Sequence, residues 1–214
     1  MDLHSWLAFV AASIALLLIP GPTVLLVLSY ALSQGRKVAV ATATGVALGD
    51  FIAMSASLAG LGALVLASAG LFTALKWAGA AYLIYLGVKL LRSAPRGDVT
   101  PEPGATPATA PQMSAKGVFG HAAMVTALNP KSIAFFIAFV PQFLDPARPL
   151  VPQFAVLVAT FVTLATLNAL AYALLADQLR DRIGRPSVLR ALTRTGGGAL
   201  IAMGLATAAL RRAA

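Results

Sequence analysis

Long apolar stretches separated by short polar connections dominate the chain. Six can be drawn, at residues 5–30, 38–67, 70–91, 117–140, 150–176 and 192–210. Because a helix of about 20 apolar residues crosses the hydrocarbon core of a bilayer, each stretch is expected to be a transmembrane helix. The sixth carries three glycines near its start, so an arrangement with five spans stays open. The pattern predicts an all-α integral membrane protein with six transmembrane helices.

Prolines interrupt two of these stretches near their middle. Pro20-Gly21-Pro22 lies in the first stretch, and Asn129-Pro130-Lys131 lies in the fourth. Proline has no backbone N–H and clashes with the preceding turn, so we expect both helices to break or kink. Irregular backbone at membrane depth is tolerated where it is buried in protein or lines a cavity. Paired interruptions of this kind point to the binding site of a transporter.

A proline-rich segment divides the chain into two halves. Residues 93–116 carry prolines among Ala, Thr and Gly, a composition typical of an extended linker. This gives a first three-helix half at 1–92 and a second at 117–214. Three spans per half make the second half enter the membrane from the opposite face, which predicts a 3+3 inverted repeat with broken first and fourth helices. Gly79 and Gly87 align with Gly196 and Gly204, and this spacing lets neighbouring helices approach closely.

The basic residues indicate how the chain is oriented. Of the sixteen Lys and Arg residues, eleven fall on one side of the six predicted spans, four on the other, and Lys131 within a span. The side richer in Lys and Arg is normally cytoplasmic. We therefore expect both termini in the periplasm and the 93–116 linker in the cytoplasm. The net charge of +9 does not indicate nucleic-acid binding, because the basic residues do not gather with aromatic ones on a soluble face.

Composition narrows the chemistry further. Hydrophobic residues make up 59% of the chain and charged residues 11%, against about 25% in soluble domains, and the mean hydropathy is +0.85. There is no cysteine and there are two histidines, which argues against disulfides, thiol redox relays and soft-metal sites. The sequence contains no dinucleotide, P-loop or zinc-protease motif. We therefore expect neither a cofactor nor enzymatic activity.

Two ionisable residues lie deep in predicted spans. They are Asp50, near the middle of the second, and Lys131, directly after Pro130. A charge at the centre of a membrane helix costs about 2.5–3.5 kcal/mol, so such residues are usually functional. Broken-helix N–H groups and Lys131 would hold a carboxylate, and Asp50 would hold an ammonium, as a zwitterionic substrate requires. A structural ion pair between Asp50 and Lys131, or a shallower position for Asp50, are the alternatives.

Two asparagines at mid-span complete the candidate site. Asn129 and Asn168 are expected either to contact the substrate or to form hydrogen bonds between helices. Interface belts or packing account for the aromatic residues, Tyr172 among them. No metal ligand and no catalytic residue are predicted.

With these residues in place, the chain resembles the LysE/RhtB family of bacterial amino-acid exporters over nearly its whole length. The matching pieces, in order, are Pro20-Gly21-Pro22, the Gly45-x3-Gly49-Asp50 stretch, the segment 75–87, and Leu128-Asn-Pro-Lys-Ser132 leading to Phe139-Val-Pro-Gln-Phe143.

The resemblance implies efflux of amino acids or close derivatives, such as homoserine, homoserine lactone, threonine, leucine or lysine, driven by proton exchange. It also implies six spans in the inner membrane and allows a homodimer. Family members differ at the position of Asp50, which leaves room for a substrate-specific role there. One deep acid favours a neutral amino acid over a dibasic one.

Other functions remain open on the sequence alone. An uptake carrier, or a channel for another small zwitterion or cation, would have the same architecture. An intramembrane enzyme would need a nucleophile with a base, a metal cluster or paired carboxylates, which one deep Asp and one deep Lys do not supply. A purely structural membrane protein would not need two spans broken at one depth.

Overall fold

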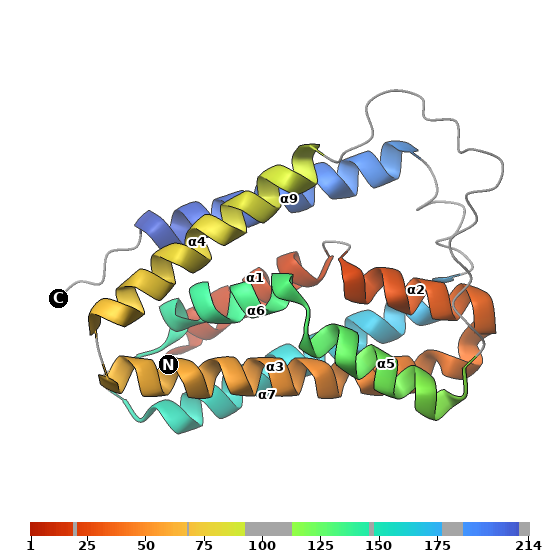
Figure 1. Ribbon diagram of the computed structural model, residues 1–214, viewed down its shortest axis with the longest axis horizontal. Coiled ribbons are helices and arrows are strands. Elements are labelled where there is room, and N and C mark those ends of the chain that lie inside the picture. The colour runs from red at the N-terminus through yellow and green to blue at the C-terminus, as the bar shows by residue number, and fades with distance from the viewer. Residues whose placement is uncertain (19–20, 68, 93–112, 146–147, 177–185, 210–214) are drawn as a thin grey trace.

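The computed structural model describes residues 1–18, 21–67, 69–92, 113–145, 148–176 and 186–209. Every regular element among these residues is helical (Figure 1). Two predicted features fall partly or wholly outside this part of the chain: Pro20, and residues 93–112 of the linker. The linker's last residues are described, and Ser114 there caps the following helix by accepting a hydrogen bond from the N–H of Gly117.

The first and fourth apolar stretches are both broken, as predicted. The first stretch forms α1 (Leu3–Leu18) and α2 (Pro22–Gln34), which meet at 55°. The fourth forms α5 (Ala115–Ala127) and α6 (Pro130–Ala138), followed by a short 3₁₀ helix, η2 (Val140–Phe143), with a bend of 45°. Pro22 and Pro130 each start the second helix of their pair, a position where the missing N–H costs nothing.

The remaining stretches form four long helices. They are α3 (Ala39–Ala67), α4 (Ala69–Arg92), α7 (Leu150–Leu174) and α9 (Pro186–Ala209). Among the described residues, α3 and α7 are long and apolar enough to cross a membrane, and each bent pair adds one more span if it is counted as a unit. The helices α4 and α9 have 24 residues each but are not in that group, so the six-span arrangement stays a prediction.

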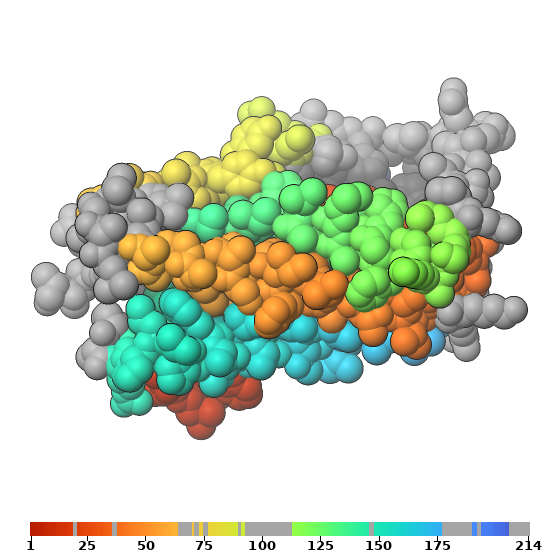
Figure 2. All heavy atoms as spheres, turned by 60° about the horizontal axis from the view of Figure 1, so that its bottom comes forward, coloured from red at the N-terminus to blue at the C-terminus, as the bar shows by residue number. Residues whose placement is uncertain are grey.

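Helices of the two halves pack on one another across the molecule. The helix α3 contacts α5 and α6, whereas α7 contacts α1 and α2. Figure 2 shows α3 in orange with α5 in green on one side and α7 in cyan on the other. The helices α4 and α9 pair along their length and cross the other helices as a separate layer (Figure 1). Each long central helix therefore packs on the broken helix of the other half.

Glycines permit the closest of these helix contacts. A Cβ on Gly49 of α3 would lie 2.5 Å from the carbonyl oxygen of Ala123 in α5. In the other layer, a Cβ on Gly87 of α4 would lie 2.6 Å from the carbonyl oxygen of Gly197 in α9. Small residues let membrane helices approach closely, as the sequence pattern indicated. The pattern did not assign the partners: Gly79, one of the paired glycines, faces Ala138 of α6.

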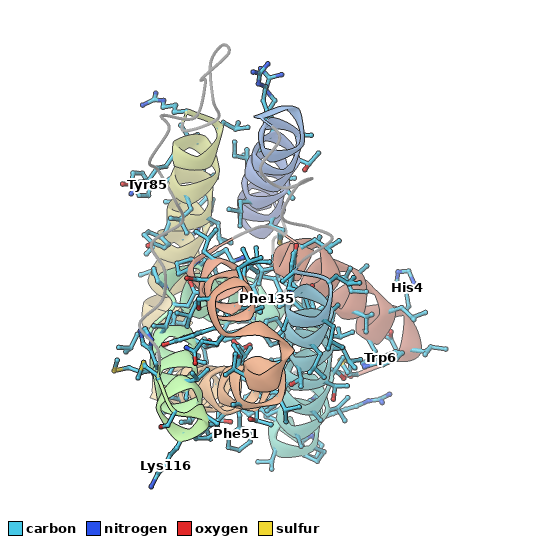
Figure 3. The ribbon with its side chains drawn as sticks, turned by 90° about the vertical axis from the view of Figure 1, so that its right-hand side faces the viewer. His4, Trp6, Phe51, Tyr85, Lys116 and Phe135 are labelled. Carbon is cyan, nitrogen blue, oxygen red and sulfur yellow. The ribbon has the colours of Figure 1, made fainter. Side chains whose placement is uncertain are left out.

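Six phenylalanines fill the space between α1, α6, η2 and α7, and we call them the phenylalanine cluster: Phe9, Phe135, Phe136, Phe139, Phe143 and Phe161. Their ring centroids are 4.8–6.5 Å apart, within the range of favourable aromatic contacts. Figure 3 shows Phe135 inside the bundle, while Phe51 and Tyr85 lie at its outer surface.

We predict that Gly49→Ala lowers the stability of the folded protein, because its methyl group overlaps Ala123 and Thr126. Overpacking of this kind costs about 1–3 kcal/mol. Gly60→Ala is the matched control, since a Cβ there meets nothing within 4 Å and lies in the same helix. Thermal unfolding of the detergent-purified protein measures both, and equal melting temperatures would contradict the proposed packing.

Candidate functional site

A small cavity lies where the two broken helices meet, and we call it the central cavity. Its volume is about 30 Å³, enough for roughly two water molecules. Side chains from both halves of the chain line it, namely Leu16, Leu17, Gly21, Thr23, Val24, Val27, Val46, Asp50, Asn129, Lys131, Ser132, Ala165, Asn168, Ala169 and Tyr172.

The end of α1 presents backbone carbonyl groups to this cavity. In an uninterrupted helix the N–H of residue 20 would bond to the carbonyl of Leu16, but proline at position 20 has no N–H. The ammonium of Lys131 donates to that carbonyl instead, at 3.1 Å. The amide of Asn168 on α7 donates to the next carbonyl, that of Leu17, at 3.3 Å. Side chains of the second half thus donate hydrogen bonds to the carbonyl groups at the end of α1.

The break between α5 and α6 is closed by Asn129. Its side-chain oxygen accepts the backbone N–H of Lys131 at 3.1 Å and so caps α6. Its amide donates to the hydroxyl of Thr23 at 3.1 Å, and that hydroxyl lies 3.4 Å from the hydroxyl of Thr126. A cap of this kind contributes about 1 kcal/mol. Asn129 therefore caps α6 in its own broken helix and also forms a hydrogen bond to α2 of the other half.

The start of α2 differs from the start of α6. Its N-cap is Gly21, and no side chain among the described residues caps it. The first hydrogen bond of the helix joins the N–H of Leu25 to the carbonyl of Gly21, so the earlier N–H groups of Thr23 and Val24 belong to the uncapped turn. Gly21, Thr23 and Val24 all line the cavity. An uncapped helix start carries partial positive charge and attracts anions.

Lys131 and Asp50 give the cavity one basic and one acidic group. Asp50 on α3 is 3% exposed and Lys131 on α6 is half-buried, and the two interact electrostatically. The close approach of α3 to α5 at Gly49 brings Asp50 to this depth. Removing one partner of a buried pair costs about 3–5 kcal/mol, because the other charge is left uncompensated. The tip of Lys131 also lies 3.2 Å from where a Cβ on Gly21 would stand.

Five residues predicted from the sequence to form the site line one cavity: Gly21, Asp50, Asn129, Lys131 and Asn168. The two asparagines also make the hydrogen bonds between helices that were the alternative interpretation. The structure thus brings these residues together, and their role in binding a substrate stays a prediction.

The two described prolines of the predicted site, Pro22 and Pro130, do not line the cavity. Pro22 and Pro130 are exposed at the first positions of α2 and α6, where they fix the place of each break. Pro20 lies outside the described residues. Their contribution to the site is the backbone geometry that they impose on the residues beside them.

Sequence reasoning missed Tyr172, which was assigned to packing or to an interface belt. It lines the cavity from α7, four residues after Asn168. Residues four apart share one face of a helix, so this spacing was the available signal. Thr23 and Ser132 were missed in the same way, although each directly follows a residue of a proline-containing break.

Comparison with known proteins adds independent information. Residues 14–210 match the model of a family described as the LysE type translocator. A membrane protein of Vibrio cholerae, named as uncharacterized, is 34% identical over 96% of this chain and 97% of its own length. Two proteins named homoserine/homoserine lactone efflux protein, from Salmonella typhimurium and Salmonella typhi, are 33% and 32% identical over the full length of both chains. No solved structure gives a significant match.

Variants of Asn129 should separate its two contacts. Asn129→Ser keeps a side-chain oxygen that can cap α6 but is too short to reach Thr23, whereas Asn129→Ala loses both contacts. We predict that the alanine variant melts at least a few degrees below the serine variant, since about 1 kcal/mol corresponds to roughly 2–4 °C in a chain of this size. If the two variants melt together in the same detergent, the cap contributes nothing measurable.

Proposed function

Because the chain belongs to the LysE-type translocator family, we propose that it is a secondary transporter that exports a small neutral amino acid, or a close derivative such as homoserine, through the central cavity. Family membership makes it a multi-pass membrane protein and a translocator rather than an enzyme. The observation that carries the proposal is the placement of Asp50, Lys131 and the uncapped start of α2 around one cavity.

The charges around the cavity suit the two ends of an amino acid. The carboxylate of the substrate binds the backbone N–H groups at the start of α2, which no side chain among the described residues caps, beside Lys131. Its ammonium binds Asp50 and the carbonyl groups at the end of α1, where the helix dipole is negative. The two ends of the α1–α2 break thus offer opposite partial charges a short distance apart, as broken helices do in other transporters.

The rest of the cavity lining favours a small, uncharged side chain. Apart from Asp50, Lys131 and the two asparagines, it consists of apolar residues such as Val27, Val46 and Ala169, together with the hydroxyl-bearing Thr23, Ser132 and Tyr172. Among the described residues Asp50 is the single acidic one in the lining, which favours a substrate with one ammonium group. The Salmonella relatives bear names that refer to homoserine, which fits these conditions.

The volume of the cavity indicates that the structure represents a closed state. An amino acid needs several times the space of the two waters that fit. Substrate therefore enters only when helices move apart, and Lys131 gives up its bond to the Leu16 carbonyl as it turns to the carboxylate. Such a change of conformation between closed and open states is what a carrier requires and a permanent pore does not.

Proton exchange is the driving force that we propose. Asp50 is buried and ionisable, so it can bind a proton in one orientation of the carrier and release it in the other. Substrate ammonium and proton then compete for the same carboxylate, which couples the outward movement of one to the inward movement of the other.

The crossed packing of the halves supports the 3+3 inverted repeat, because α3 meets α5–α6 as α7 meets α1–α2. In this arrangement the protein lies in the bacterial inner membrane with both termini in the periplasm. A homodimer stays a prediction, which the mass of the detergent-purified protein tests.

The first experiment measures counterflow of labelled homoserine in proteoliposomes. We predict that Asp50→Asn and Lys131→Met each reduce uptake at least about tenfold, since each removes a charged hydrogen-bond partner worth about 1.5–3 kcal/mol. Lys116→Met is the control, because Lys116 is exposed at the start of α5 and is not among the described residues that line the cavity.

The double variant Asp50→Asn/Lys131→Met decides between binding and a purely structural ion pair. It leaves no unpaired buried charge, so it should regain much of the stability lost in the single variants. If the two residues bind substrate, counterflow stays abolished in the double variant. Restored counterflow would show that the pair only holds the halves together.

A second experiment tests the proton coupling. We predict that a pH gradient accelerates homoserine movement through the unmodified protein, and that Asp50→Asn abolishes this acceleration at every pH tested. Asp50→Glu, which retains a carboxyl group, should keep part of it. Gradient-driven flux that is unchanged in Asp50→Asn would rule out Asp50 as the coupling residue.

A further inference from the structure

Ser13 is a buried polar residue that the proposed function has not used. It lies in the middle of α1, its side chain is 0% exposed, and its hydroxyl has no hydrogen-bond partner among the described residues. Helical hydroxyls usually donate to the carbonyl four residues earlier, as Thr160 and Thr166 do in α7. A buried hydroxyl without a partner costs about 1–3 kcal/mol, so its presence in an apolar helix needs an explanation.

The position of Ser13 places it between the central cavity and the phenylalanine cluster. Leu16, three residues later, lines the cavity, and Phe9, four residues earlier, belongs to the cluster. All three are buried and share one face of α1, because residues three and four apart lie one above the other. From Leu16 to Phe9 the helix advances ~10 Å.

Two more of the helices that line the cavity, α6 and α7, lead to the same cluster. On α6, Lys131 lines the cavity and Phe135 follows one turn later. On α7, Ala165 lines the cavity and Phe161 precedes it by one turn. The rings of Phe135 and Phe161 are 6.0 Å apart, and Phe135 also contacts Phe9 at 6.5 Å. The cluster therefore closes the cavity in the direction of the start of α1.

The backbone that carries Phe139 and Phe143 of the phenylalanine cluster is irregular. The helix α6 ends at Ala138, and η2 with Pro141 carries the chain on to Phe143. The ring of Phe143 is half-buried and contacts Phe9 at 5.4 Å. Rings on such a segment can swing away without breaking a long helix, which distinguishes this part of the core from the packing between straight helices.

We propose that the transported amino acid leaves the central cavity along α1, contacts the Ser13 hydroxyl on the way, and passes through the phenylalanine cluster as a hydrophobic gate. In the closed state the rings exclude water, so the Ser13 hydroxyl is not hydrated. In the open state water and substrate reach Ser13 and provide the hydrogen bonds that it lacks. Apolar constrictions control passage in this manner in other membrane proteins. The inference rests on the proposed transport function.

The test exploits the absence of cysteine from the chain. Ser13→Cys provides one thiol, and a membrane-impermeant methanethiosulfonate is added to proteoliposomes from the side that exposes an N-terminal tag. Labelling is measured in three proteins: Ser13→Cys alone, Ser13→Cys with Phe143→Ala, and Ser13→Cys with Phe154→Ala. Phe154 is the matched control, because it is also half-buried and packs on the same core but contacts no ring of the cluster among the described residues. No amino acid is needed, so the result does not depend on the counterflow assays.

A second reporter, Ala80→Cys, monitors general loosening of the bundle. Ala80 is 1% exposed, and its carbonyl lies against Gly204 of α9, away from the proposed path. We expect Phe143→Ala to speed labelling at position 13 roughly tenfold, because it removes two ring contacts. Phe154→Ala should leave that rate unchanged, and labelling at position 80 should stay slow in all backgrounds.

Three results would overturn the gate: no labelling at position 13 from this side, equal effects of Phe143→Ala and Phe154→Ala, or a parallel rise at position 80. Failure of homoserine counterflow together with the expected labelling pattern would instead overturn the proposed substrate and leave the path in place for another solute.

Discussion

Backbone groups that proline leaves without helical partners, at the middle of a membrane helix, are the constraint on which this structure depends. Lipid offers them no hydrogen bonds, so protein must supply them. Here the second half supplies them to the first: Lys131 donates to the carbonyl of Leu16 and Asn168 to the carbonyl of Leu17. Asn129 adds a bond between side chains, to the hydroxyl of Thr23. The need to satisfy one broken helix draws the other broken helix and α7 toward it, and the central cavity is the space that they surround.

In the proposed mechanism, the same groups serve folding and substrate binding in turn. Lys131 donates to the Leu16 carbonyl in this structure, and the proposal has a substrate carboxylate draw it away. A ligand shifts a conformational equilibrium only by its differential affinity for the two states. A polar network that is satisfied by protein when empty and by substrate when loaded allows that shift without a large loss of stability in either state. The small volume of the cavity agrees with such a closed, self-satisfied state.

The sequence predicted the helical segments and both breaks, because apolar length and proline chemistry act locally. It also identified Asp50 and Lys131, since charge is rare at membrane depth. It did not identify Tyr172, because an aromatic residue in a membrane helix faces lipid, a neighbour or a cavity with the same local pattern. The spacing of Gly79 and Gly87 predicted close helix contacts but not that Gly79 packs on α6 and Gly87 on α9, since glycine spacing marks a close contact without naming the partner.

The order of apolar and broken segments was thus determined by the sequence itself, through constraints that each act within a few residues. Only the tertiary structure decided which orphaned carbonyl meets which side chain, because those partners lie 115 and 151 positions apart in the chain. It also decided that Ser13 and six phenylalanines stand in line with the cavity. The local sequence determines which backbone groups lack a helical partner, whereas the packing of distant helices determines which side chains form hydrogen bonds with them.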